Sequence, residues 1–185
     1  VYDATKYLIQ EENRKKILLI SNIEELSVGK YRINGYNKAI EESGLSPNIL
    51  KLGREKNPRT FIYNYLNKNP EIDAILSIDH ITGIMALNKS KLVGKRIPED
   101  ISVIGFGYED AKYVSSPKIS VIDQKAFEIG QNSAELLLNH LGSVEKIPHK
   151  TIMVSSTTLA CHQNRQRRLL PFPSLPLLTP THLSP

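Results

Sequence analysis

The chain has 185 residues, one cysteine, a formal net charge of +5 and 40% apolar residues. This size is enough for one folded unit with a real core, and no run approaches the roughly 18 apolar residues of a membrane span. A lone cysteine excludes an intramolecular disulfide and a cysteine-based metal cage, and it fits a reducing, cytoplasmic location. The composition therefore indicates a soluble globular protein.

The positive charge is concentrated near the C-terminus. Arg165, Arg167 and Arg168 lie in residues 160–185, which contain no acidic residue, and without this segment the formal charge falls from +5 to +2. The rest of the chain has no basic face interleaved with aromatic residues. The sequence therefore does not favour direct binding of nucleic acid by this chain.

Strand-like and helix-like patterns alternate along the first two thirds of the chain. Ser27 is a plausible N-cap, and Gly44 is a stop signal for the same helix. Apolar periodicity predicts helices over 2–13, 27–44, 58–70 and 80–94, with strands over 16–21, 48–52, 74–78 and 101–106. The strands are apolar throughout, as in a parallel sheet that is covered on both faces. The predicted fold class is α/β, with a doubly wound parallel sheet.

The pattern changes after Phe106. A polar connection leads to a short β segment at 118–122, a long helix at 125–142 and a last strand at 151–158. The tail that follows contains five prolines among many leucines, so we expect it to be disordered or extended, and a non-native extension is an open alternative. The opening helix has no strand before it, which indicates that a preceding segment is missing.

Polar residues follow the predicted strands at their carboxyl ends, where an open parallel sheet binds its ligands. An arginine, with carboxylates, amides and a tyrosine, suits a polyhydroxylated or anionic small molecule. These residues are Asn22, Arg54, Glu55, Asp79, His80, Tyr108, Glu109 and Asp110, with Arg32 about a turn and a half into the following helix.

Each of these residues also has a purely structural interpretation. Arg32 can be a solvated helix residue, Asp79 can simply cap the helix that follows it, and Tyr108 can pack on the edge of the sheet. His80 has no second ligand at metal-binding spacing.

Enzymatic interpretations have little support. The first strand-to-helix turn, SNIEELSVG, lacks the glycine pattern of dinucleotide binders and the Gly-Lys-Ser/Thr of a P-loop. There is no Gly-x-Ser-x-Gly elbow and no activated nucleophile. We therefore expect no enzyme activity, no catalytic residue, no cofactor and no metal.

Several segments, taken in order, resemble the lac-repressor and purine-repressor family of bacterial transcriptional regulators. The pattern runs through ATKYLIQEENRKKILLISN, RINGYNKAIEESGL, DAILSIDHITGIMAL, RIPEDISVIGF and SPKISVIDQKAFEIGQNSAELLLNHL. The resemblance covers nearly all of residues 2–159, and its length makes it specific. It implies the effector-binding core of a regulator, which has a type I periplasmic-binding-protein-like fold, forms a homodimer and contacts DNA only through an N-terminal headpiece absent here.

The resemblance also implies a division of the chain. Residues 1–117 would form the C-terminal lobe, 118–142 would return to an otherwise absent N-terminal lobe, and 143–159 would supply the last strand of the C-terminal lobe. The remaining residues, 160–185, would be the tail.

Family effector contacts carry over unevenly. Arg32, in R-x-x-G-Y, matches the arginine that reaches the effector, and Gln124 matches a glutamine near the hinge. Asp79 matches the aspartate of the family's Asn-Asp or Thr-Asp pair, with Ile78 in place of the polar first residue, and Gly107 stands where the family usually has aspartate. The expected effector site, for a sugar or related molecule, comprises Arg32, Asp79, Asn22, Tyr108, Asp110 and Gln124, with Glu109 or Asp110 as a substitute for the missing carboxylate.

Two other functions share this fold class. A periplasmic sugar-binding component of a transporter would have a signal peptide instead of a helix-turn-helix, and a Rossmann or flavodoxin-type enzyme would bind a nucleotide or flavin.

Overall fold

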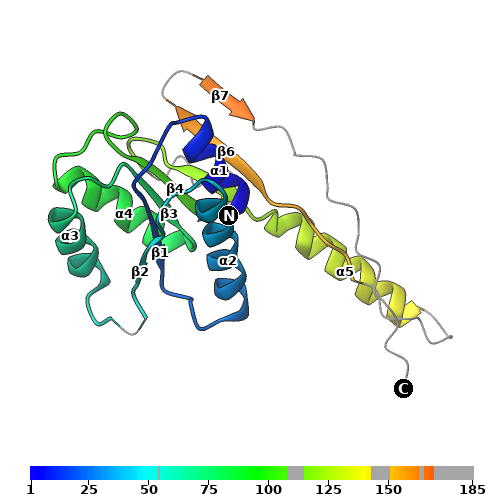
Figure 1. Cartoon of the computed structure of the whole chain (residues 1–185). Helices are drawn as coiled ribbons and strands as arrows, with labels where there is room; N and C mark the ends of the chain where they lie inside the picture. Colours follow the sequence, from blue (N-terminus) through cyan, green and yellow to red (C-terminus); the bar gives the residue numbers. More distant parts are fainter. Residues whose placement is uncertain (54, 108–114, 143–150, 163–164, 169–185) are drawn as a thin grey trace.

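The computed structural model describes residues 1–53, 55–107, 115–142, 151–162 and 165–168 (Figure 1). The helices and strands follow the predicted order, with one further strand at the end. They are α1 (Tyr2–Gln10), β1 (Ile17–Ser21), α2 (Ser27–Glu42), β2 (Asn48–Lys51), α3 (Pro58–Lys68), β3 (Ala74–Ser77), α4 (His80–Leu92), β4 (Ser102–Gly107), β5 (Ser120–Asp123), α5 (Ala126–Gly142), β6 (Thr157–His162) and β7 (Arg165–Arg168).

Local signals set several of the helix ends. Pro58 occupies the first turn of α3, and the Asn57 side chain caps this helix by accepting a hydrogen bond from the Thr60 N–H. Gly44 has a left-handed φ of 65°, as expected of a residue that ends a helix. The expectation for Ser27 was wrong: α2 begins at Ser27 itself, and its N-cap residue, Leu26, has no capping side chain.

The strands of the described residues form one seven-stranded sheet in the order β2-β1-β3-β4-β5-β6-β7. The first five are parallel, and β6 and β7 are each antiparallel to the strand before them. The prediction of a doubly wound, mostly parallel α/β sheet is confirmed. The chain turns to opposite sides after β1 and β3, which creates a topological switch point between their carboxyl ends.

Helices cover both faces of the parallel strands (Figure 1). Alternate strand residues point to opposite faces of the sheet. Leu18 and Ile20 of β1 pack in the cluster that includes Ile62 of α3 and Leu87 of α4. On the other face, Ile17, Leu19, Leu76 and Ile104 pack with Leu8 of α1 and Tyr36 of α2. This double coverage explains why the strands read as unbroken apolar runs.

The later elements differ from the expected division of the chain. β5 hydrogen-bonds in parallel with β4, so it belongs to the same sheet as the strands before it. β6 begins at Thr157 instead of residue 151, and β7 lies within the predicted tail. Residues 169–185 fall outside the described part of the chain. The lobe assignment itself stays a prediction.

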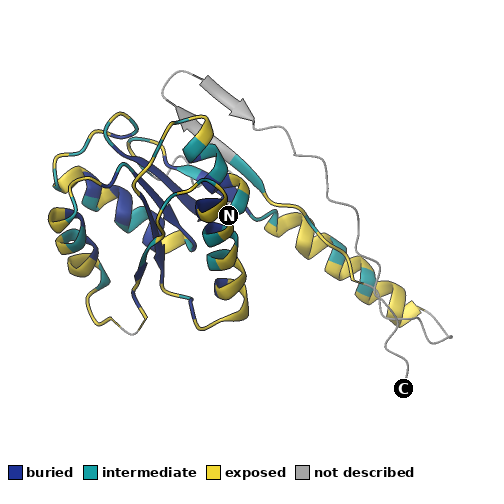
Figure 2. Ribbon diagram, viewed as in Figure 1, coloured by how far each residue is buried: buried dark blue, intermediate teal, exposed yellow. Residues whose placement is uncertain are grey.

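Helix α5 extends away from the rest of the molecule (Figures 1 and 2). None of its 17 residues is buried, although Phe127, Leu137, Leu138 and Leu141 are large and apolar. Figure 2 shows the contrast with α1 to α4, whose inner sides are buried against the sheet. The helix therefore presents an uncovered apolar face. A 17-residue amphipathic helix ordinarily buries such a face against a partner.

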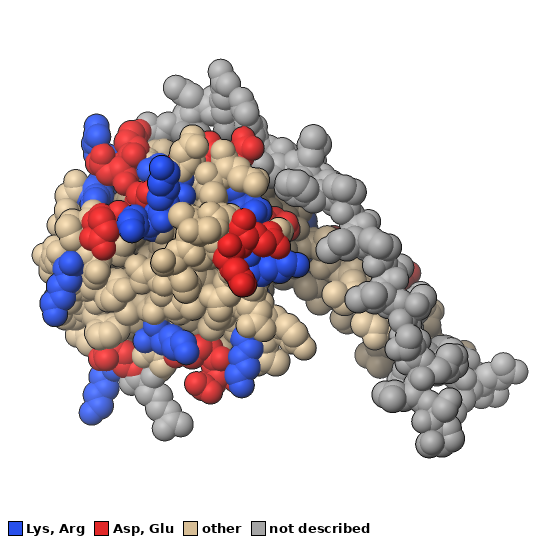
Figure 3. Space-filling model, in the orientation of Figure 1, with Lys and Arg blue, Asp and Glu red and all other residues tan. Residues whose placement is uncertain are grey.

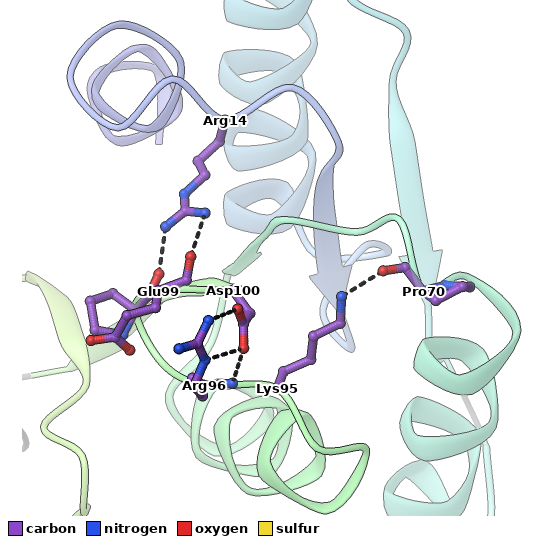
Figure 4. Close-up of polar contacts among 7 residues, drawn as sticks. Arg14, Pro70, Lys95, Arg96, Glu99 and Asp100 are labelled. Carbon is purple, nitrogen blue, oxygen red and sulfur yellow. Dashed lines mark hydrogen bonds and ion pairs between the residues drawn. The ribbon is translucent and has the colours of Figure 1, made fainter.

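Charged side chains join the loops at the amino end of the parallel strands (Figure 4). Arg14, before β1, donates to the backbone carbonyls of Pro98 and Glu99, before β4. Arg96 forms a two-pronged pair with Asp100, at 2.7 and 2.9 Å, and this guanidinium holds the pKa of the Asp100 carboxyl well below its usual range. This edge of the sheet is thus fixed by contacts between loops.

Positive and negative side chains are interspersed on the face seen in Figure 3, which shows no field of a single sign. Among the described helices, none is long and apolar enough to cross a bilayer. The described residues also contain no group of three or more histidine, cysteine or acidic side chains placed to hold a metal.

Candidate functional site

The candidate site lies at the carboxyl edge of the parallel sheet, beside the switch point. Its central residue is Arg32, which the second turn of α2 carries over the ends of β3, β4 and β5. Its Nη1 donates to the Ile78 carbonyl oxygen at 2.6 Å, and its Nη2 donates to Gln124 Oε1 at 2.9 Å. Residues 78 and 124 each directly follow a strand. One side chain thus links two strand ends, 46 and 92 residues away in sequence.

The Arg32 guanidinium also stacks on an aromatic ring. Its Cζ lies 3.7 Å from the ring centroid of Phe106, the penultimate residue of β4. This distance is well inside the range of a cation–π contact, which strengthens when water is excluded. The stack and the two hydrogen bonds together fix the plane of the guanidinium.

Burial lowers the pKa of Arg32 without removing its charge. Removal of the guanidinium from water lowers its pKa below the usual value, and the nearby Asp79 carboxylate partly opposes that effect. The guanidinium borders an open groove of about 430 Å³, whose lining includes Val28, Tyr31, Phe106, Gln124 and Ile129. A charged, planar donor group thus faces a groove with aromatic and aliphatic walls, as small-molecule sites commonly do.

Asp79 acts as the N-cap of α4. Its Oδ1 accepts a hydrogen bond from the Thr82 N–H at 2.8 Å, and its Oδ2 accepts one from the Thr82 hydroxyl. Both carboxylate oxygens are therefore engaged within the chain. The contacts of Asp79 are therefore those of a helix cap. Direct contact between Asp79 and an effector stays a prediction.

We expect Asp79→Ala to destabilise the chain by about 1 kcal/mol, because the first turn of α4 loses its side-chain cap. Asp79→Asn should retain most of this stability, since an amide oxygen can still accept from the Thr82 N–H. Urea denaturation of the two variants beside the parent chain measures the difference. Equal losses in both would show that the negative charge, and not the cap, is what stabilises α4.

The other predicted site residues are distributed unevenly. Gln124 lies beside Arg32, and its backbone N–H donates to the Gly107 carbonyl oxygen at 3.3 Å. Asn22 directly follows β1 and is exposed. Tyr108 and Asp110, together with Arg54 and Glu109, lie outside the described residues. The structure thus brings Arg32, Gln124 and Asp79 to one edge.

Two features of the site were not expected from the sequence. Phe106 was identified only as part of a buried strand, yet the Arg32 guanidinium stacks on its ring. Ile78 was noted for its lack of a polar side chain, yet its backbone carbonyl binds Arg32 while its side chain is fully buried. The sequence did hold one signal for both residues, which is their position at the carboxyl ends of inner strands. Residues at these ends lie at the edge of the sheet where ligands bind.

Comparison with known proteins agrees with this fold. Residues 5–160 match the family model described as the periplasmic binding protein-like domain. The chain is 28% identical over 169 residues to the HTH-type transcriptional repressor CytR of Escherichia coli K12, a match that covers 86% of this chain and 49% of CytR. It is 31% identical over 143 residues to the HTH-type transcriptional regulator MalR of Clostridium butyricum, covering 75% and 42% of the two chains. The chain thus spans about half the length of the curated relatives it matches.

Solved structures show the same relationship. A LacI-family regulator from Corynebacterium glutamicum superposes with a TM-score of 0.70 at 28% identity, over 86% of this chain and 61% of that one. A LacI-family regulator from Enterococcus faecium, solved with bound ribose, gives a TM-score of 0.66 at 27% identity, over 79% and 55% of the two chains.

Proposed function

Because the chain belongs to the periplasmic binding protein-like domain family, in its lac-repressor and purine-repressor branch, we propose that it is the effector-binding part of a transcriptional regulator. The observation that carries the proposal is Arg32, held by Ile78, Gln124 and Phe106 at the switch point of the sheet. There the guanidinium faces the groove with a fixed orientation, so it can recognise a small polar molecule. The effector would contact Arg32 first, with Asp79, Asn22, Tyr108, Asp110 and Gln124 around it.

The uncovered face of α5 supports a second lobe opposite this edge. A helix with exposed Phe127, Leu137, Leu138 and Leu141 gains about 25 cal/mol for each Å² of apolar surface that a partner buries. We propose that α5 packs in that lobe and that the effector binds between the two. The lobes would close on the effector and change the arrangement of a homodimer.

In this proposal the chain is a binding module and not an enzyme. Effector binding shifts an equilibrium between two arrangements of the lobes. The free energy of this shift is set by the difference between the effector's binding free energies for the two arrangements. DNA would be contacted by a helix-turn-helix segment outside this chain, in the cytoplasm. The named relatives are HTH-type regulators, which favours this function over a transporter's binding component.

The proposal is tested by calorimetry of the full protein with ribose, lactose, cellobiose, nucleosides and sugar phosphates. We expect at least one class to bind, and Arg32→Ala to weaken that binding at least tenfold, as loss of a charge-assisted hydrogen bond implies. Arg59→Ala is the matched control, because Arg59 is an exposed arginine on α3. If no class bound while the protein stayed folded and dimeric, the effector role would be wrong.

A further inference from the structure

Arg32 is distinguished by the absence of an ion-pair partner among the described residues, although the charge of Asp79 still acts on it. Among the described residues that line its groove, it is the only charged side chain. Its partners are neutral: a backbone carbonyl, a glutamine amide and a phenyl ring. No ion pair involves it in the described part of the chain. Among the described residues, this half-buried guanidinium thus has no paired carboxylate to offset its loss of hydration, and only the charge of the nearby Asp79 partly does so.

The buried and half-buried carboxylates that the described residues place at this edge are already bound within the chain. Glu24, three residues after β1, accepts from Ser21 Oγ at 3.0 Å. Asp79 binds Thr82 through both oxygens. Asp123, the last residue of β5, accepts from the Lys125 N–H at 2.9 Å and pairs with Lys125 Nζ at 3.0 Å. A ligand at this edge therefore meets carboxylates that already have hydrogen-bond or ion-pair partners within the chain.

The end of β4 adds no acceptor side chain. Gly107 is its last residue, and it lies in register with Asp123 of β5 beside the ring of Phe106. Neutral polyols are held largely by acceptors that take their hydroxyl protons, and carboxylates are the strongest of these. The described part of the groove offers a cationic fork of donors instead, which matches a phosphate or a carboxylate.

Resting on the proposed function, we propose that the effector is an anionic small molecule, a phosphorylated or carboxylated sugar, whose negative group pairs with Arg32. The anion supplies the paired counter-charge that the described residues of the groove do not give Arg32. The ring of Phe106 and the aliphatic wall then contact the uncharged part of the ligand. Its negative group, rather than its hydroxyls, provides most of the selectivity.

Calorimetry of the full protein with matched ligand pairs tests this inference. The pairs are ribose 5-phosphate against ribose, glucose 6-phosphate against glucose, and glucuronate against glucose. We expect the anionic member of at least one pair to bind ten times more tightly or better, with a preference that falls as salt increases. A preference in either phosphate pair indicates a phosphorylated effector, and a preference for glucuronate over glucose indicates a carboxylated one.

Variants separate the charge from the fold. Arg32→Gln should remove the preference, Arg32→Lys should keep part of it, and Arg59→Gln should leave it unchanged, each with an unfolding midpoint measured alongside. Gly107→Asp should strengthen binding of the neutral member and weaken that of the anionic one, and Gly107→Asn serves as its uncharged control.

The outcomes are distinct. Tighter binding of the neutral members, or a preference that survives Arg32→Gln in a folded protein, overturns the anionic effector and leaves the regulator function standing. Absence of binding by every ligand contradicts both.

Discussion

Replacing Gly29 by alanine is expected to destabilise the chain by more than about 3 kcal/mol. Gly29 lies in the first turn of α2 and is buried against the turn that follows β1. A Cβ at this position would lie 1.8 Å from the Ile23 carbonyl oxygen and 2.6 Å from its carbon. These are backbone atoms, which cannot rotate away, so the turn or the helix must move.

The expected sign is opposite to that of helix propensity, which favours alanine over glycine by up to about 1 kcal/mol. Gly130 of α5 is the matched control, because a Cβ there meets nothing within 4 Å. Gly130→Ala should therefore cause no loss and should strengthen its own helix. Denaturant unfolding followed by circular dichroism measures both variants. A Gly29→Ala chain as stable as the parent would show that the turn after β1 adapts easily, and that α2 does not depend on this close approach.

Replacing Tyr36 by phenylalanine is expected to cost about 1 to 3 kcal/mol, although the ring stays in place. The Tyr36 side chain is fully buried under the start of β1 and β2. Its hydroxyl donates to the Ile17 carbonyl oxygen at 2.8 Å and accepts from the Asn48 N–H at 3.0 Å. The variant loses both bonds and keeps the apolar contacts, so the measured loss isolates the hydroxyl.

The same hydroxyl gives the stability an alkaline dependence. Burial raises the pKa of Tyr36 from 10.0 to about 12, because the charged phenolate would lose its hydration. Below pH 10 both the folded and unfolded chains keep the proton, and the contribution is complete. Between pH 10 and about 12 only the unfolded chain releases it, so stability falls. The difference in unfolding free energy between parent and Tyr36→Phe should therefore shrink over this range, and a constant difference would contradict the assignment.

Much of the fold was predictable because the sheet is buried on both faces. A strand covered on both sides is mostly apolar, so β1 and β3 appear in the sequence as short apolar runs, each of which ends in a buried serine. The last strands were harder to predict. β7 is the edge strand and β6 lies between it and β5, and both are antiparallel additions to the parallel strands. The placement of β5 depends on its pairing with β4. Pairing between distant segments leaves little trace in local composition.

The placement of Arg32 and Asp79 at this edge was predictable, but their contacts were not. Parallel strands bring their carboxyl ends to one edge, which was sufficient to expect Arg32 and Asp79 there, whereas Gln124 was expected only from the family resemblance. The sequence could not show that Asp79 caps α4 with both oxygens, because a cap and a ligand group occupy the same position. The stack on Phe106 depends on the tilt of α2 over the sheet, which follows from packing.

The junction between β5 and α5 has a mechanical consequence. Gln124, which holds Arg32, stands one residue before Lys125, whose left-handed φ of 56° sets the turn into the helix. A 17-residue helix is about 25 Å long, so a tilt of about 10° at this junction moves its far end by about 4 Å. A ligand that breaks the hydrogen bond between Arg32 and Gln124 would thus act next to the junction with α5, where a small rotation produces a large displacement at the far end of the helix.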